Sequence, residues 1–180
     1  MLSPYETPAQ VSAKNVFKTI ALCEGHGLNP VSLLRKYGLF ALRRNQWCSL
    51  QTNLNMLQEI QDHVGELSMT EMGRKTAELL YFPRAVNTIH KAFLSLNHVY
   101  HTNHQGNVGS YEVVVLSPYH IQVIAQTPYP CDFQYGLCWG IAQRFLPAKT
   151  AVQVERARPL CSQQGQTRCI YDVRWEMPQN

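Results

Sequence analysis

The sequence has no long hydrophobic run and no secretory leader. A membrane-spanning helix needs roughly 20 consecutive apolar residues, and no segment approaches that length. The first residues also lack the basic and apolar regions of a signal peptide. The sequence therefore predicts no membrane insertion and a cytoplasmic location.

The chain also has only a small excess of charge of one sign. The chain has 16 Lys and Arg against 12 Asp and Glu, a formal net charge of +4. The clearest basic run, Arg35-Lys36 with Arg43-Arg44, is short and lacks the interleaved aromatic residues of a nucleic-acid surface. We expect no direct binding of nucleic acid.

The common catalytic motifs are missing as well. There is no phosphate loop, nucleophile elbow, zinc-protease motif or dinucleotide fingerprint. Cys23 near His26 is the nearest approach to a nucleophile and base, but the glycines on either side of His26 are typical of a helix end. We assign no catalytic residue, and the sequence favours a binding domain over an enzyme.

The composition that is present indicates a globular protein. Hydrophobic residues make up 45% and charged residues 16% of 180, which suits a single domain over residues 1–180. Residues 1–105 have helical periodicity, and residues 106–180 are mostly strand-like. The helical half is predicted to contain about five helices, near residues 10–24, 30–37, 49–65, 68–81 and 85–102.

The second half predicts two strands, a helix and two further strands. Their expected ranges are 110–116, 119–126, 133–146, 149–159 and 167–176. In the last strand Cys169, Tyr171, Val173 and Trp175 alternate with more polar residues, so one face of the sheet should be covered. The predicted fold class is α+β, with the helical half packed on an antiparallel ββαββ sheet unit.

Four cysteines concentrate in this half. Cys161 and Cys169 flank Gly165 at equal distance, so a hairpin should bring their thiols together. Cys138 lies on the preceding helix and Cys131 lies seven residues earlier. Three interpretations remain open: buried reduced thiols, ligands of Zn²⁺, or a disulfide between Cys161 and Cys169 in an oxidising setting.

The segment from Tyr129 to Trp175, with its helix rich in small residues and its two cysteines around a glycine, resembles the 4-vinyl-reductase-type ligand-binding domains. Their superfamily includes haem nitric-oxide-binding domains and subunits of the transport-protein-particle tethering complex. The resemblance implies a homodimer with an internal pocket for a small apolar or aromatic ligand.

The resemblance also implies a zinc site beside that pocket. Cys138, Cys161 and Cys169 match three of its ligands, but Arg158 stands where a glutamate is expected. Cys131 is the candidate for a fourth ligand, because zinc accepts all-cysteine sets.

Haem is expected to be unlikely. The haem-binding branch of the superfamily pairs a proximal histidine with a Tyr-x-Ser-x-Arg clamp for the propionates, and no such string occurs here. His98, His101 and His104 recur every three residues near a helix end, where a solvated polar rim is the favoured interpretation.

The leading functional hypothesis is a small-molecule-binding sensory or regulatory domain, an input module of a bacterial signalling or transcription protein. Tyr111, Tyr129 and Trp139 are the candidates to line its apolar pocket, against the alternative that they are ordinary core residues. Two other hypotheses remain: a ligand-free dimerising protein-interaction module, and a haem-based gas sensor.

Overall fold

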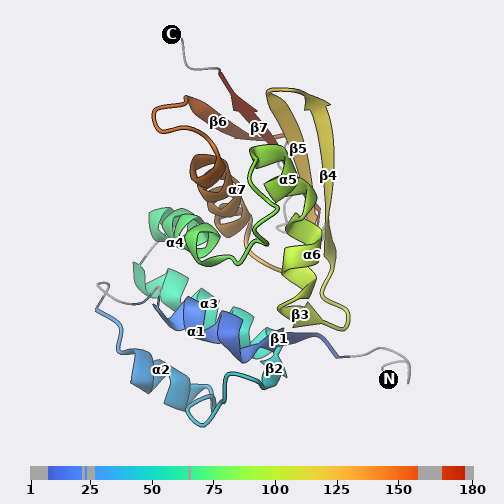
Figure 1. Ribbon diagram of the computed structural model, residues 1–180. Coiled ribbons are helices and arrows are strands. Elements are labelled where there is room, and N and C mark those ends of the chain that lie inside the picture. The colour runs from blue at the N-terminus through green and yellow to red at the C-terminus, as the bar shows by residue number, and fades with distance from the viewer. Residues whose placement is uncertain (1–7, 22, 24–26, 65, 158–167, 177–180) are drawn as a thin grey trace. The chain divides into compact units, whose positions relative to one another are not determined.

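A computed structural model describes residues 8–21, 23, 27–64, 66–157 and 168–176 (Figure 1). Contacts within the chain divide it into two compact units. Unit 1 comprises residues 1–68 and 100–108, and unit 2 comprises residues 69–99 and 109–180. The boundaries fall within two helices, α4 (Glu66–Leu79) and α6 (Leu96–His101). That the chain acts as one sensory domain stays a prediction.

Unit 1 is mainly helical and contains a small sheet. Its helices are α1 (Ala13–Ala21), α2 (Pro30–Lys36) and α3 (Leu50–Val64), each at a position that the periodicity predicts. Asn29 caps α2 by accepting from the backbone N–H groups of Val31 and Ser32, and Pro30 occupies the first helical position, where no backbone donor is needed.

The small sheet of unit 1 is a feature that the sequence does not predict. Its strands are β1 (Gln10–Ser12), β2 (Trp47–Ser49) and β3 (His104–Gln105), in the antiparallel order β2-β1-β3. Strands of two or three residues are too short to show an alternating pattern.

Unit 2 contains the predicted ββαββ arrangement. Its elements are β4 (Ser110–Ser117), β5 (His120–Gln126), α7 (Cys131–Phe145), β6 (Val152–Arg156) and β7 (Cys169–Trp175). The strands form one antiparallel sheet in the order β4-β5-β7-β6. The predicted α+β fold class is therefore confirmed. None of the described helices is long and apolar enough to cross a membrane.

Two helix boundaries differ from the prediction. The helix expected to begin at Ser68 begins at Glu66, so Ser68 lies inside α4 and is not its cap. The single helix expected over residues 85–102 is two short helices, α5 (Ile89–Leu94) and α6, separated at Ser95. The Ser95 hydroxyl donates to the carbonyl of Ala92, a local bond that competes with regular helix geometry.

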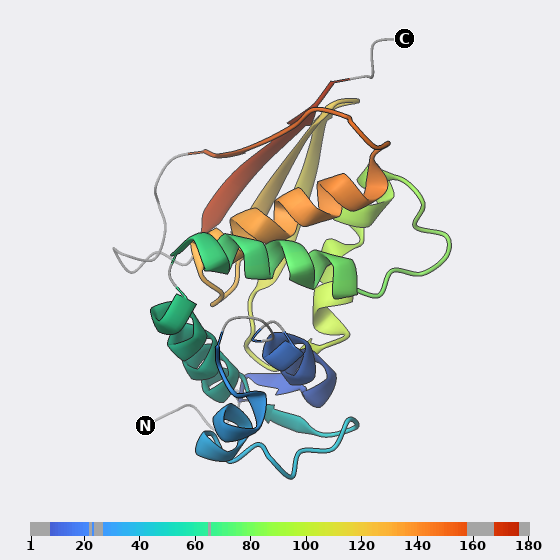
Figure 2. The ribbon, with the colours of Figure 1, turned by 90° about the vertical axis from the view of Figure 1, so that its left-hand side faces the viewer.

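The two faces of the unit 2 sheet have different surroundings. Tyr171 and Val173 of β7 and Val123 of β5 are fully buried on the inner face, against α7. Figure 2 shows α7 lying along this face and α4 lying on the far side of α7. The alternate residues of the same strands, among them His120 and Arg174, lie on the outer face.

Three glycines allow the backbones of α4 and α7 to approach closely. A Cβ atom on Gly73 of α4 would lie 2.1 Å from the carbonyl oxygen of Phe133, and one on Gly136 of α7 would lie 1.9 Å from that of Thr70. On Gly140 it would lie 2.7 Å from the Cβ of Ala77. No side chain fits at these positions unless the helices move apart.

We predict that Gly136→Ala destabilises the protein by about 1–3 kcal/mol or more, because the new methyl group would collide with backbone rather than with a flexible side chain. Urea unfolding measures the effect. Glu78→Ala on the exposed side of α4 is the matched helical control, with an expected change within about 0.5 kcal/mol. Equal stability of the two variants would show that the helices do not make this contact.

Candidate functional site

A pair of thiols lies where α7 begins and β7 begins. The Sγ atoms of Cys131 and Cys169 are 2.8 Å apart. Cys131 is the first residue of α7 and is partly exposed, and Cys169 is the first residue of β7 and is 9% exposed. Two of the four cysteines that the sequence selects are thus in contact.

Tyr171 and Cys138 adjoin this pair. The Tyr171 hydroxyl donates to the carbonyl oxygen of Cys131 at 2.9 Å. Burial, followed by the nearby thiols of Cys169, Cys138 and Cys131, raises the pKa of Tyr171. Burial also raises the pKa of the Cys138 thiol to about 12, so it stays protonated at neutral pH.

The zinc hypothesis receives no support from the described residues. They contain no group of three or more His, Cys, Asp or Glu side chains that could hold a metal ion. Cys161, which the hypothesis also requires, and the glycine of its hairpin lie outside the described residues. The expectation of zinc is therefore corrected.

The aromatic residues that were candidates for a ligand pocket have different surroundings. The Tyr111 hydroxyl donates to Gln134 Oε1 at 2.6 Å, and the side-chain amide of Gln134 donates to the Thr127 hydroxyl. All three side chains are buried. Tyr111 therefore joins β4 to α7 through a chain of buried hydrogen bonds, and its role in ligand binding stays a prediction.

Tyr129 and Trp139 lie apart from that chain. Tyr129 is buried and stacks on Phe133 in the first turn of α7, with ring centroids 5.4 Å apart. Trp139 is half-buried, and the Arg74 guanidinium of α4 lies 5.9 Å from its ring centroid. Their role in ligand binding stays a prediction.

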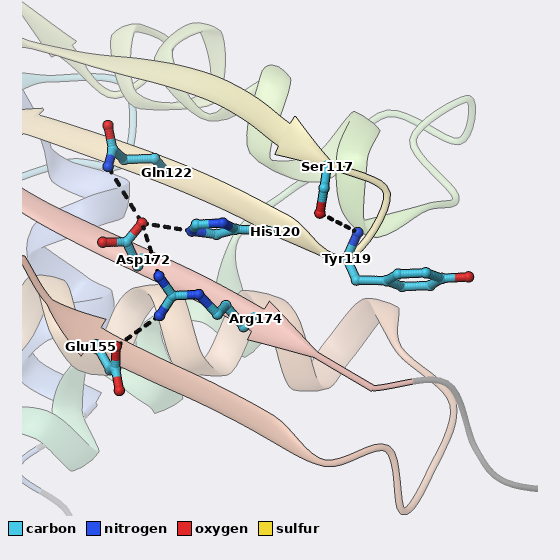
Figure 3. Close-up of polar contacts among 7 residues, drawn as sticks. All are labelled: Ser117, Tyr119, His120, Gln122, Glu155, Asp172 and Arg174. Atoms are coloured by element: carbon cyan, nitrogen blue, oxygen red, sulfur yellow. Dashed lines mark hydrogen bonds and ion pairs between the residues drawn. The ribbon is translucent and has the colours of Figure 1, made fainter.

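A polar cluster that the sequence did not reveal covers part of the outer face of the sheet (Figure 3). Asp172 of β7, 11% exposed at its side chain, lies 2.6 Å from His120 Nε2 and accepts from Gln122 Nε2. Arg174 bridges Asp172 and Glu155 of β6 at 3.9 and 2.7 Å. The register aligns Gln122, Asp172 and Glu155 in one row across three strands.

A surface cleft of about 470 Å³ lies at the end of this cluster, lined in part by Tyr119, His120, Arg174 and Trp175. The Arg174 guanidinium pairs with both carboxylates of the cluster. The Ser117 hydroxyl beside it accepts from the backbone N–H of Tyr119. The arrangement is a cross-strand network that supports the sheet.

Two histidines of the described residues contact the last strand, β7, and two others are exposed on α6. His120 pairs with Asp172, and the ring of His90 lies against Trp175 at 5.4 Å between centroids. His98 and His101 of α6 are exposed, and no hydrogen bond or ion pair joins either imidazole to another described residue. The ring of His101 packs edge-on against Tyr100 at 5.3 Å.

His104 is different because it is buried in unit 1. It is 5% exposed, its Nδ1 lies 2.9 Å from the carbonyl oxygen of Tyr100, and its ring stacks on the Tyr100 ring at 4.0 Å. The Tyr100 hydroxyl in turn donates to the carbonyl oxygen of Val108. Burial lowers the pKa of His104 to about 4, so the ring is neutral at pH 7.

Comparison with known proteins identifies solved structures with the same fold. No family model and no curated protein matches the sequence. An oxygen-binding H-NOX domain related to soluble guanylate cyclases, in its oxygen complex, aligns with a TM-score of 0.67 and 13% identity over 94% of this chain and 100% of that one.

Two further structures agree. An H-NOX protein from S. oneidensis in the Fe(II)NO ligation state aligns with a TM-score of 0.61 and 15% identity, over 91% of this chain and 97% of that one. A variant of the T. tengcongensis H-NOX domain aligns with a TM-score of 0.63 and 14% identity, over 93% and 99%. The fold of this chain is therefore that of the H-NOX structures over nearly its whole length.

These comparisons correct two expectations. The resemblance to 4-vinyl-reductase-type domains is wrong, because the similar structures are haem nitric-oxide-binding domains. It rested on the cysteine hairpin and on element order, and element order does not separate two α+β folds. The expectation that haem is unlikely is also overturned, since the similar structures are of haem proteins.

We predict that the buried His104 makes folding stability pH-dependent. Its folded pKa of about 4 lies below the ordinary 6.5, so the unfolded state takes up the proton first and stability falls as the pH drops from about 6.5 towards 4. The full loss is about 3 kcal/mol. Urea unfolding at pH 7.5 and pH 5 should show a smaller loss for His104→Gln than for the natural protein.

His63→Gln is the control for that comparison, because His63 is exposed on α3. It should keep the pH dependence of the natural protein. If His104→Gln keeps that dependence as well, His104 is not the group responsible.

Proposed function

We propose that this chain is a sensory domain that binds haem and, through it, a small gas molecule. The observation that carries the proposal is the likeness to H-NOX structures over 91–94% of the chain in the three alignments described above. These structures include an Fe(II)NO state and an oxygen complex, and one of them concerns haem distortion in the H-NOX family. This supports the gas-sensor hypothesis over a pocket for an apolar organic ligand.

The chain contains histidines, the residue type that commonly binds haem iron. Haem iron in sensors and globins is held by the nitrogen of a neutral imidazole, and the iron then offers a position to a diatomic gas. His104 is engaged with Tyr100, and His120 with Asp172. His101 is exposed and its ring packs edge-on against Tyr100, so it is the residue that would hold the iron.

The propionate groups would need a different anchor from the one that the resemblance implies. The sequence contains no Tyr-x-Ser-x-Arg string. Three tyrosines have Thr or Cys two residues later, namely Tyr5, Tyr100 and Tyr129, and none of them has Arg four residues later. Tyr129 and Phe133 stack on each other in the protein interior and offer no cation. We therefore expect weaker haem retention than a clamped domain would have.

Reconstitution with hemin under reducing conditions tests this proposal. The natural protein should develop a Soret band at a stoichiometry of one haem per chain and shift it on addition of nitric oxide. His101→Ala should lose most of that absorbance, because the iron loses its protein ligand. Circular dichroism checks that the variant is folded.

His98→Ala is the matched control, one helical turn earlier on α6 and equally exposed. It should keep the Soret band. If His98→Ala loses the band and His101→Ala keeps it, the ligand assignment is wrong. If the natural protein takes up no hemin, the haem proposal fails, and thermal-shift screening with small apolar and aromatic compounds then tests the remaining sensory hypothesis.

We also propose that the chain forms a homodimer through the edge of β4 that pairs with no strand among the described residues. Figure 1 shows β4 as an outer strand of the sheet. At the first residues of β4 a side chain already bonds to this edge, because the backbone N–H of Tyr111 donates to Asn97 Oδ1. Backbone groups alternate in direction along an antiparallel strand, so those of Val113 and Val115 point to the same edge.

The composition of this edge favours a second copy. Val114, Val115, Leu116 and Tyr119 are 36–50% exposed, whereas the opposite edge strand, β6, carries Glu155 and Arg156. Charged residues protect sheet edges against pairing, and β4 has none between Val113 and Ser117. Two copies of β4 paired antiparallel about Val114 would place Val113 opposite Val115 and bring no like charges together.

Val114→Lys should separate the dimer, because two lysines would face each other at the symmetry axis. Light scattering on a concentration series should give twice 20.6 kDa for the natural protein and 20.6 kDa for the variant. Gln153→Lys on β6 is the control and should remain dimeric. A natural protein that stays monomeric, or a Val114→Lys variant that stays dimeric, would contradict the assignment.

The wider setting follows from these proposals. A domain of this kind would serve as the input module of a bacterial signalling protein in the cytoplasm. Its link to transcription stays a prediction from the sequence.

A further inference from the structure

We infer that Cys131 and Cys169 form a redox-active pair, which a peroxide converts to a disulfide that ties the start of α7 to the start of β7. Their sulfur atoms are 2.8 Å apart, less than one ångström beyond the length of a disulfide bond, about 2.05 Å. The site is separate from the iron ligand proposed above and does not depend on haem.

The surroundings of the pair determine which sulfur reacts first. Cys131 is partly exposed and opens a helix of 15 residues, Cys131–Phe145. A helix N-terminus favours a negative charge, and the thiolate is the reactive form of cysteine. Cys169 is buried on the inner face of the sheet, next to Cys131, where peroxide has poor access. Cys131 is the attacking thiol and Cys169 the resolving one.

The reaction balances with hydrogen peroxide as the oxidant. The Cys131 thiolate attacks one peroxide oxygen, the O–O bond breaks, and a sulfenic acid and water result once the leaving hydroxide takes a proton. The Cys169 sulfur then attacks the Cys131 sulfur, the S–O bond breaks, and a second water leaves. The two sulfurs lose two electrons and two protons in total, and the peroxide gains them.

The neighbouring side chains keep the pair aligned. The Tyr171 hydroxyl holds the Cys131 carbonyl at 2.9 Å, and Cys169 is paired with Ala125 in the β5–β7 ladder. Both backbones are thus fixed before oxidation. Among the described residues, Cys138 is a further thiol near the pair; it is fully buried and its raised pKa keeps it unreactive.

The disulfide would close a chain segment with a sequence separation of 38 residues. Closing a loop of that length restricts the unfolded chain and stabilises the folded protein. In a chain of this size the melting temperature should rise by roughly 5–15 °C on oxidation and return after treatment with dithiothreitol.

The test is thiol counting and non-reducing peptide mapping of the full chain before and after one equivalent of hydrogen peroxide. The denatured protein should lose two of its six titratable thiols, and the map should contain one new peptide pair joining Cys131 to Cys169, two hydrogens lighter than its parts. Cys131→Ser and Cys169→Ser should each abolish that pair and the rise in melting temperature.

Two control variants should keep the pair. Cys48→Ser removes a half-buried thiol of unit 1, and Cys161→Ser removes the other cysteine that the sequence places near Cys169. A disulfide between Cys161 and Cys169, a stable sulfinic acid on Cys131, or six remaining thiols would each overturn the inference. The haem assay on the same samples is independent, so failure of one proposal is distinguishable from failure of the other.

Discussion

The close packing of α4 against α7 is the constraint on which unit 2 depends. Gly73, Gly136 and Gly140 remove the side chains that would hold the two backbones apart. Because the interior of a protein is as dense as an organic crystal, a helix pair in such contact cannot move by the width of a methyl group without leaving voids or clashes. The position of α7 is therefore fixed by contacts on two of its sides, with the sheet on one side and with α4 on the other.

That fixed position allows polar groups on the inner face of the sheet to bond to one another. Gln134 of α7 reaches both Tyr111 and Thr127, and Tyr171 reaches the first carbonyl of α7. Each buried donor in these chains has an acceptor, and such a network specifies one relative placement of helix and strands. On the outer face, ionic contacts of Asp172 and Arg174 link three strands in the same way.

The sequence predicted the elements whose patterns are long. The alternation in β7 and the apolar stripe of α3 extend over enough residues to establish a period, and both elements lie where they were expected. It failed where a feature depends on few residues or on distant partners. The strands β1 to β3 have two or three residues each, and the outer cluster joins Asp172 to His120, which is 52 positions away. Only the strand order brings those two together.

The family resemblance failed for a related reason. The cysteines were interpreted as a hairpin motif, in which spacing around Gly165 brings Cys161 and Cys169 together. That hairpin lies outside the described residues, so the facing of these two thiols stays a prediction. The contact that the described residues contain joins the start of a helix to the start of a strand, 38 positions apart. A local sequence motif cannot predict the Cys131–Cys169 contact, because this contact depends on the path of α7 across the sheet. Comparison of the whole fold with known structures includes that path.

The same geometry connects the helix packing to the thiol pair. Gly136 lies five residues after Cys131, little more than one turn along α7. A shift of α7 by about one ångström at that turn would move the Cys131 sulfur by a similar distance. That distance exceeds the difference between the present sulfur–sulfur separation, 2.8 Å, and a disulfide bond of about 2.05 Å. The contact of Gly136 with α4 would therefore influence how closely the Cys131 and Cys169 sulfurs approach, so helix packing and the proposed disulfide formation should change together in any variant that moves α7.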